Sequence, residues 1–373
     1  MNKEYTCLGM MSGTSGDGVD ASIIQSDGLD KLTVLREKYY EYDESLFRDY
    51  QELKKKINSS NDLKKYSSAI KNLENTITIF HARVVKDITE DFEIDLIGFH
   101  GQTIFHNPQE KISLQLGNGN LLSQLTKKKI VYNFRKNDIN NGGEGAPLTP
   151  IFHKYLLKSK KIELPACILN IGGISNLTLI NNLNEHEIIS EDVGPGNCLI
   201  NEWIQNHTNK KFDQGGRISN IGKINEVILE QALETHENNF QKRNYISLDT
   251  NDFDISFARG LNLEDGAATL TAFTAKIITS KISFLLRKHG DKKINIIVCG
   301  GGRKNESLIK HIKSNSQKNL FFFNSDKFQL DGDFIESQAF AYLAIRSILS
   351  LPISFPSTTG CNSPCSGGEI AEA

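Results

Sequence analysis

The sequence predicts an α/β protein with a duplicated plan, and three glycine-rich turns lead to that prediction. Apolar strands run directly into glycines near residues 13, 172 and 301. A second apolar strand follows each of the first two turns, which indicates hairpins at 8–24 and 166–180, whereas a helical pattern follows the third. Because the same hairpin plan occurs twice in one chain, we expect two similar halves.

The chain is long enough for two domains with separate cores, because it has 373 residues. Its formal net charge of −2 gives no indication of a nucleic-acid or membrane-surface partner. We find no apolar run near the roughly 20 residues of a membrane-spanning helix, and the first ten residues lack the apolar stretch of a secretory signal. We therefore expect a cytoplasmic protein without a membrane or nucleic-acid partner.

The six cysteines are scattered, which predicts reduced and mostly buried thiols rather than a disulfide framework. Only Cys361 and Cys365 are close in sequence, and no histidine lies near them to complete a zinc site. A redox role for this pair is an alternative.

The first glycine turn lies within LGMMSGTSGDGVDASII, residues 8–24. Glycines let backbone N–H groups approach a ligand, and successive N–H groups form a nest for an anion. Two aspartates in the turn would repel a bare phosphate, so phosphate with Mg²⁺ is the simplest ligand that suits the whole turn. An ordinary glycine-rich hairpin is the alternative. The residues of this candidate site are Gly13, Thr14, Ser15, Gly16, Asp17, Gly18, Val19 and Asp20.

Residues 45–90 have a helical pattern, and a short apolar strand at 95–99 follows them. We expect this strand to end at the polar residues His100, Gln102 and Thr103, because ligands bind at the carboxyl edge of such sheets. A binding role for the 101–103 segment is favoured. The two histidines nearby, His100 and His106, either transfer protons or only orient the loop.

A long polar loop with Arg135 follows a strand near residue 130. The planar guanidinium of arginine suits a carboxylate or a phosphate. A structural pair between Arg135 and Asp138 explains the same residues equally well.

The second hairpin contains Gly172 and Gly173, and the segment SEDVGPGN follows it at 190–197. Asp192 precedes the turn of this segment, where we expect its carboxylate to face a cleft. The alternative is an aspartate that caps the next helix.

The third turn, Gly300–Gly302, offers a backbone surface without side chains, which suits an adenine or a ribose. Helical patterns occupy 265–290 and 334–349, and Glu336 lies in the first turn of the second one, where the helix dipole favours it in any case. The tail from Pro352 is rich in small and polar residues, and we expect its last residues to be mobile.

Eight ordered motifs together resemble those of the anhydro-N-acetylmuramic acid kinases, a family of the sugar kinase, heat-shock ATPase and actin superfamily. They are MSGTSGDGVD, GFHGQTIFHNP, FRKNDINNGGEGAPLTPIFH, LNIGGISNLT, DVGPGN, DGAATLTAFTA, CGGGRKN and ESQAFAYLA. The resemblance implies a duplicated actin-like, ribonuclease H-like fold with mixed five-stranded sheets and a central nucleotide cleft. It implies an N-terminal lobe of 1–133 with 350–373, and a C-terminal lobe of 134–349.

The resemblance also implies a reaction in which 1,6-anhydro-N-acetylmuramate, ATP and water give N-acetylmuramate 6-phosphate and ADP, in the recycling of cell-wall muropeptides. It implies a homodimer, with Asp192 as the base and Glu336 helping to hold the water. ATP and Mg²⁺ would bind at 13–20, with Asp17 and Asp20 as metal ligands and Gly172, Gly173 and Gly300–Gly302 completing the nucleotide site. The sugar would contact His100, Gln102, Thr103 and Arg135.

The chain departs from the family pattern in places. Gly16 stands where the family usually has leucine, and Tyr245-Ile246 stands where it usually has Pro-Lys. Another class of function is a nucleotide-gated sensor of muropeptide sugars with little turnover, and the presence of Asp192 argues against it.

Overall fold

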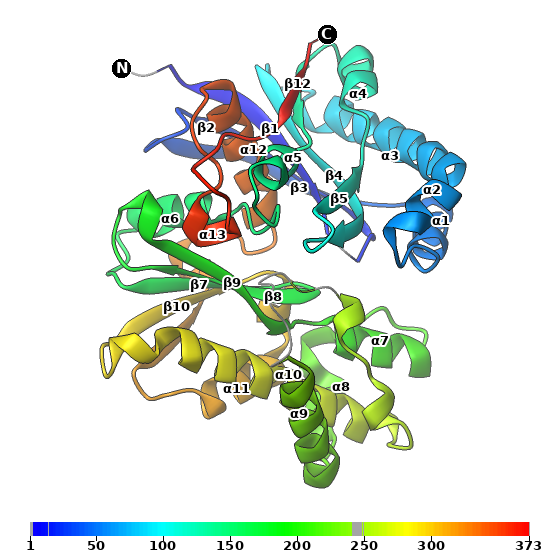
Figure 1. Cartoon of the computed structure of the whole chain (residues 1–373), viewed down its shortest axis with the longest axis vertical. Helices are drawn as coiled ribbons and strands as arrows, with labels where there is room; N and C mark the ends of the chain where they lie inside the picture. The colour runs from blue at the N-terminus through cyan, green and yellow to red at the C-terminus, as the bar shows by residue number, and fades with distance from the viewer. Residues whose placement is uncertain (1–2, 14, 241–247, 249, 373) are drawn as a thin grey trace. The chain divides into compact units, whose positions relative to one another are not determined.

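A computed structural model describes residues 3–372 apart from 14, 241–247 and 249. The chain forms two compact units. Unit 1 contains 1–161, 183–189 and 333–373, and unit 2 contains 162–182 and 190–332. In Figure 1 the blue, cyan and red parts of the chain therefore belong to unit 1, and most of the green, yellow and orange parts belong to unit 2.

The sheet of unit 1 has the strand order β12-β6-β4-β1-β2-β3, and β5 pairs with β4 outside this path. β1 is antiparallel to β2 and parallel to β4, so the sheet is mixed. The strands are β1 (Tyr5–Ser12), β2 (Gly18–Ser26), β3 (Leu32–Glu41), β4 (Leu96–Asn107), β5 (Ile112–Leu116), β6 (Lys129–Tyr132) and β12 (Glu369–Ala371).

The sheet of unit 2 repeats this arrangement, with the strand order β11-β10-β7-β8-β9. β7 is antiparallel to β8 and parallel to β10, as β1 is to β2 and to β4. The predicted duplicated α/β fold is therefore confirmed, and unit 1 adds β5 and β12 to the shared five strands. The strands are β7 (Ala166–Ile171), β8 (Ile174–Ile180), β9 (Ile188–Pro195), β10 (Ile294–Cys299) and β11 (Leu320–Asn324).

In unit 1, α12 (Ile335–Ile348) packs directly on the backbone of the sheet. A Cβ atom on Gly9 of β1 would lie 2.0 Å from the Ser337 carbonyl oxygen, and one on Gly98 of β4 would lie 2.3 Å from that of Phe340. The neighbouring glycines thus form a flat seat for the helix. The other helices are α1 (Glu44–Lys54), α2 (Ser60–Lys65), α3 (Ser67–Ile88), α4 (Gly119–Thr126), α5 (Lys136–Asn140), α6 (Pro150–Ser159) and α13 (Pro356–Thr359).

In unit 2, α10 (Leu263–Leu286) is the main core helix, and its alanines and threonines are buried. Among the described residues, the helical stretch Leu263–His289 alone is long and apolar enough to cross a membrane, but 67% of its most apolar window is buried inside the protein. This burial is typical of the core helix of a globular protein. The other helices are α7 (Cys198–His207), α8 (Arg217–Ile221), α9 (Glu226–Phe240) and α11 (Glu306–Asn315).

Two features of unit 1 differ from the sequence predictions. Residues 134–161 and 333–349 belong to unit 1, whereas they were predicted in the C-terminal lobe of 134–349. The reason is that α12 rests on β1, β2 and β4, and α6 packs against α12. The prediction of a mobile tail is wrong for the described residues up to 372. Here β12 pairs with β6, and Glu369 accepts hydrogen bonds from Asn133 (2.9 Å) and Lys136 (2.5 Å).

Candidate active site

The first glycine turn connects β1 to β2 in unit 1 and is held by side chains from other elements. The Gln102 amide donates to the Gly13 carbonyl oxygen over 2.7 Å, and the Gln51 amide donates to that of Ser15 over 2.6 Å. The Ser15 hydroxyl donates to Asp17 Oδ1 over 2.6 Å. The two amide bonds thus fix the turn from outside, and the Ser15–Asp17 bond fixes it from within. Thr14 lies outside the described residues.

The acidic residues of this turn, Asp17 and Asp20, are half-buried and lie near Tyr39. Burial, followed by the charges of Asp17, Glu41 and Asp20, raises the pKa of the Tyr39 phenol. Among the described residues, the two aspartates do not belong to a cluster of three or more metal-ligating side chains. They could therefore hold a cation only with further oxygen ligands, such as those of a nucleotide's phosphates.

The predicted end of a strand at Phe99 is wrong, because β4 continues to Asn107. Gly101 has a φ of +77°, and the pairing with β1 shifts register between Met10 and Ser12. This bulge lets the strand bend and continue beside β5. As a result Gln102 is completely buried and bonded to the first turn, rather than exposed at a sheet edge. Thr103 is half-buried, and its hydroxyl accepts from the Gln115 amide over 3.3 Å.

Arg135 and His100 form one hydrogen-bonded group in unit 1. The Arg135 guanidinium donates to His100 Nε2 over 2.9 Å and to the Gly145 carbonyl oxygen over 2.9 Å. The Nδ1–H of His100 therefore donates to the Gly101 carbonyl oxygen at 2.8 Å. Burial and the charge of Arg135 hold the pKa of His100 well below its usual range, so the ring is neutral and orients Arg135.

Glu336 lies in the first turn of α12 and is half-buried. Burial raises the pKa of its carboxyl group, and the positive charge of Arg135 opposes that shift. Unit 1 thus brings three of the residues selected from the sequence, His100, Arg135 and Glu336, into one electrostatic group.

Unit 1 should lose stability in mild acid before unit 2 does. All three histidines that are fully buried among the described residues, His81, His100 and His153, lie in unit 1. Burial lowers the pKa of His81 to about 4 and that of His153 to about 3. An unfolded histidine titrates near pH 6.5. Between that pH and the folded pKa the unfolded chain binds more protons, so stability falls as the pH drops from about 6.5 towards 4.

Calorimetry between pH 7.5 and pH 4.5 measures how the melting temperature changes with pH. Hydrogen exchange over the same pH range, corrected for the intrinsic exchange rates of the amides, shows which unit opens first. Peptides of unit 1 should lose protection first, and His153→Leu should flatten the pH dependence. Replacing His207, an exposed histidine of α7 in unit 2, should not change it. If peptides of unit 2 lost protection at a higher pH than those of unit 1, the buried histidines would not be the cause of the acid sensitivity.

The second hairpin and the Asp192 segment are joined in unit 2. The backbone N–H groups of Gly196 and Asn197 donate to the carbonyl oxygens of Gly173 and Gly172, both over 2.8 Å. Asp192 lies on β9, half-buried, and its Oδ2 accepts from the Leu248 N–H over 2.7 Å. The alternative that Asp192 caps a helix is wrong, because α7 begins after Asn197.

The third turn packs against the second hairpin. A Cβ on Gly300 would lie 2.4 Å from Asn170 Oδ1, and one on Gly302 would lie 2.2 Å from Ile171 Cγ2. Asn170 and Ile171 are the last residues of β7, directly before Gly172. Unit 2 therefore brings the second and third glycine turns together.

Each of the three turns has one glycine that protein packing does not require. Gly16, Gly18, Gly300 and Gly302 are explained by close neighbours; a Cβ on Gly16 would lie 2.0 Å from the Tyr50 ring. By contrast, the nearest atom to a Cβ on Gly13 would be 3.6 Å away and on Gly172 3.5 Å away, and none lies within 4 Å at Gly301. None of these three has a positive φ. The packing of the protein therefore leaves the backbone at these three positions open.

Three residues around the first turn, Gln51, Tyr42 and Tyr50, were not predicted from the sequence. Gln51 and Tyr50 belong to α1, and the Tyr50 hydroxyl donates to the Thr103 carbonyl oxygen over 2.8 Å. The Tyr42 hydroxyl lies 3.1 Å from the Ser12 hydroxyl. No motif marks them, because their partners lie far away in the chain.

Comparison with known proteins agrees with the motifs. The family model described as anhydro-N-acetylmuramic acid kinase matches residues 5–373. Proteins of that name from Pelagibacter ubique and Brucella canis are 53% and 37% identical, over 100% and 97% of this chain and equal shares of theirs. A ROK family glucokinase from Streptomyces griseus, solved with glucose and AMPPNP, matches 90% of this chain and 98% of its own at a TM-score of 0.41 and 11% identity. The whole-chain family match and these identities show that the chain belongs to the anhydro-N-acetylmuramic acid kinase family.

Proposed function

We propose that the chain is an ATP-dependent kinase that opens the ring of 1,6-anhydro-N-acetylmuramate with water and phosphorylates O6, giving N-acetylmuramate 6-phosphate and ADP. Membership of the family supports this assignment. The structural observation in its favour is the open backbone at Gly13, Gly172 and Gly301, one at each strand end where a nucleotide would approach.

The residues at the three turns fit a magnesium-bound nucleotide. Backbone N–H groups at 13–20 and at Gly172-Gly173 would hold phosphates, and Gly300–Gly302 would face the nucleoside. Asp17 and Asp20, with the exposed Ser15 hydroxyl between the glycines, would hold the cation together with phosphate oxygens. The bound ATP supplies the phosphoryl group.

The chemistry of the sugar explains why a base is needed. A 1,6-anhydro sugar has no free 6-hydroxyl, so the C1–O6 bond must break while the oxygen of water bonds to C1. O6 then bonds to the γ-phosphorus, and the bond to ADP breaks. Asp192 would take the proton of the water, as the base of an inverting glycosidase does. Glu336 would help to hold that water.

The sugar would be oriented by Arg135, whose fork suits the lactyl carboxylate. His100 would keep the guanidinium in place rather than act as an acid or base, since both of its ring nitrogens are engaged in hydrogen bonds within the protein. Gln102 would support sugar binding by holding the first turn, and Thr103 would do so from the backbone of β4. Recycling of cell-wall sugars in the cytoplasm by a homodimer, without nucleic acid or membrane partners, is the setting that this activity implies.

Mass spectrometry of the product formed in ¹⁸O-labelled water tests the reaction. The label should enter the anomeric oxygen and not the phosphate, and ADP should form only when the anhydro-sugar is present. Label in the phosphate would show that water attacks phosphorus rather than C1, and would contradict the proposed reaction. Sugar binding without turnover would favour a sensor instead.

Replacing Gly301 by valine should abolish ATP binding while the fold is retained. A Cβ there meets no atom within 4 Å, so the side chain would project into space where we place the nucleoside. Isothermal titration with ATP and thermal unfolding measure the two effects separately.

The matched contrast is Gly302→Ala, whose Cβ would lie 2.2 Å from Ile171 Cγ2. That variant should lower the melting temperature even without nucleotide. Unchanged ATP affinity in Gly301→Val would place the nucleoside elsewhere.

A further inference from the structure

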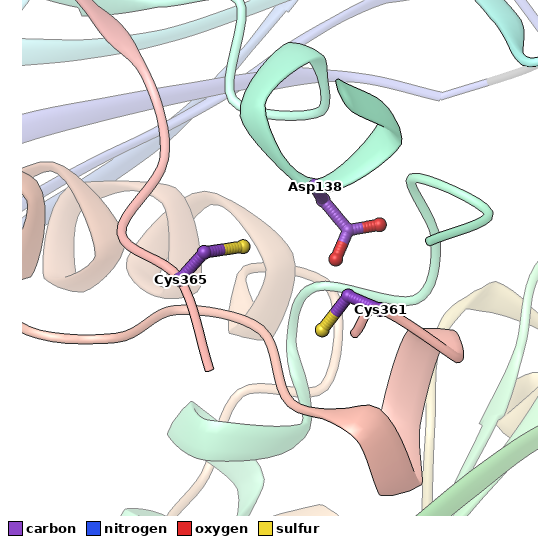
Figure 2. Close-up of side chains that lie close together, drawn as sticks. All are labelled: Asp138, Cys361 and Cys365. Atoms are coloured by element: carbon purple, nitrogen blue, oxygen red, sulfur yellow. The ribbon is translucent and has the colours of Figure 1, made fainter. Parts of the chain in front are cut away.

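Three metal-ligating side chains meet in unit 1, outside the residues assigned to the kinase reaction. Figure 2 shows Asp138, Cys361 and Cys365 lying close together, with the Cys365 sulfur turned towards Asp138. One ligand atom from each lies within 4.8 Å of the other two. Asp138 and Cys361 are both 1% exposed, and Cys365 is half-buried. Within the described residues this is the one cluster of its kind.

The backbone around the cluster is fixed by hydrogen bonds between distant segments. Ser354 and Cys365 form an antiparallel bridge, which turns the C-terminal segment back on itself. The Asn362 N–H donates to the Asn141 carbonyl oxygen over 2.8 Å, and the Glu144 N–H donates to that of Thr359 over 2.8 Å. The two cysteines are therefore held beside α5, which carries Asp138.

The Asp138 carboxylate is oriented by neutral donors. The Gly145 N–H donates to Oδ2 over 2.7 Å, and the Thr359 hydroxyl donates to Oδ1 over 2.6 Å. Among the described residues no cationic side chain forms an ion pair with Asp138. A carboxylate offers about four lone-pair sites, and these two hydrogen bonds occupy two of them. A buried carboxylate normally needs a cation or a metal ion.

The donor set indicates the type of cation. Two thiolates select a soft or borderline metal such as zinc over magnesium or calcium, and zinc also accepts carboxylate oxygen. A disulfide between Cys361 and Cys365 would use only two of the three groups and would leave the charge of Asp138 uncompensated. A metal ion would compensate all three.

We propose that Asp138, Cys361 and Cys365 bind one divalent metal ion of the zinc type, with solvent in the fourth tetrahedral position. The ion would fasten the C-terminal segment to α5. Through Gly145, which accepts from Arg135 and donates to Asp138, it would also stiffen the loop that holds Arg135. This site does not depend on the proposed kinase reaction.

Cobalt titration of the full-length protein tests the site. The chain is stripped of metal, kept reduced with a phosphine, and titrated with Co²⁺, which absorbs in the near ultraviolet when thiolates bind it. We expect one Co²⁺ per chain, displacement by Zn²⁺, and a higher melting temperature with either metal. Cys361→Ser and Cys365→Ser should each abolish the thiolate band, and Cys198→Ser, outside the cluster, should retain it.

Two results would overturn the site: absence of the band in the reduced wild-type chain, or its persistence in Cys361→Ser and Cys365→Ser. Asp138→Asn removes a hydrogen-bond acceptor that the fold uses, so circular dichroism must first show that this variant is folded. The two cysteine variants test metal binding whether or not Asp138→Asn folds. Kinase activity need not be measured.

Discussion

Replacing Asp192 by asparagine should lower turnover of the anhydro-sugar by about 10²–10⁴-fold, the usual contribution of a general base. Asparagine has the same shape but cannot take a proton from water at neutral pH. The fold should survive, because its side-chain oxygen can still accept from the Leu248 N–H that Asp192 binds at 2.7 Å. ATP affinity should change little.

The neighbouring Glu191 provides the matched control. It lies on the same strand, β9, and its carboxylate pairs with Lys281 at 2.7 Å. Successive side chains of a strand point to opposite faces. Glu191→Gln should therefore remove a carboxylate next to Asp192 and leave kcat unchanged. Single-turnover kinetics with both variants separates chemistry from product release, and full activity of Asp192→Asn would exclude it as the base.

Replacing Arg135 by alanine should lower kcat/KM for the sugar by about 10–100-fold, because a hydrogen bond to a charged group contributes about 1.5–3 kcal/mol. It should also move the acidic limb of the pH–rate profile to higher pH. The positive charge of Arg135 opposes the rise that burial causes in the pKa of Glu336, so removing it raises that pKa further. If ionised Glu336 holds the water, activity is then lost at a higher pH.

Two variants separate charge from shape at this position. Arg135→Lys keeps the charge but not the fork, so it should raise KM while the pH profile stays in place. Lys136→Ala removes the adjacent cation, which pairs with Glu369 at 2.5 Å, and should alter neither quantity. A pH profile unchanged in Arg135→Ala would show that Glu336 does not limit the rate.

Local patterns were enough to predict the two hairpins, because each strand and its turn are contiguous in sequence. The same reasoning failed at His100 and Gln102, where polar residues suggested the end of a strand. Gln102 remains inside the sheet because the Gly13 carbonyl oxygen, far away in sequence, accepts from its amide. The exposed strand β3 was also missed, since its burial does not alternate along the strand.

The sequence predicted only those candidate site residues that lie within a recognisable local motif. The roles of Asp192, Glu336 and the glycine turns come from family motifs and remain proposals, although the open Cβ positions at Gly13, Gly172 and Gly301 agree with them. The supporting contacts of Tyr50 and Gln51 have no local signature. The absence of a histidine near Cys361 argued against a metal, because Asp138 reaches the thiols only through the tertiary fold.

The seat of α12 on Gly9 and Gly98 has a consequence for biosynthesis. The helix and β12 come from residues 333–373, whereas the strands that they complete include the first ones to leave the ribosome. A nascent chain therefore carries an uncovered sheet face until residues 333–373 have been made, whereas residues 162–332 contain all five strands of the sheet of unit 2. Such exposed apolar surface is what chaperones bind, so stalled or truncated chains should aggregate through the first-made unit.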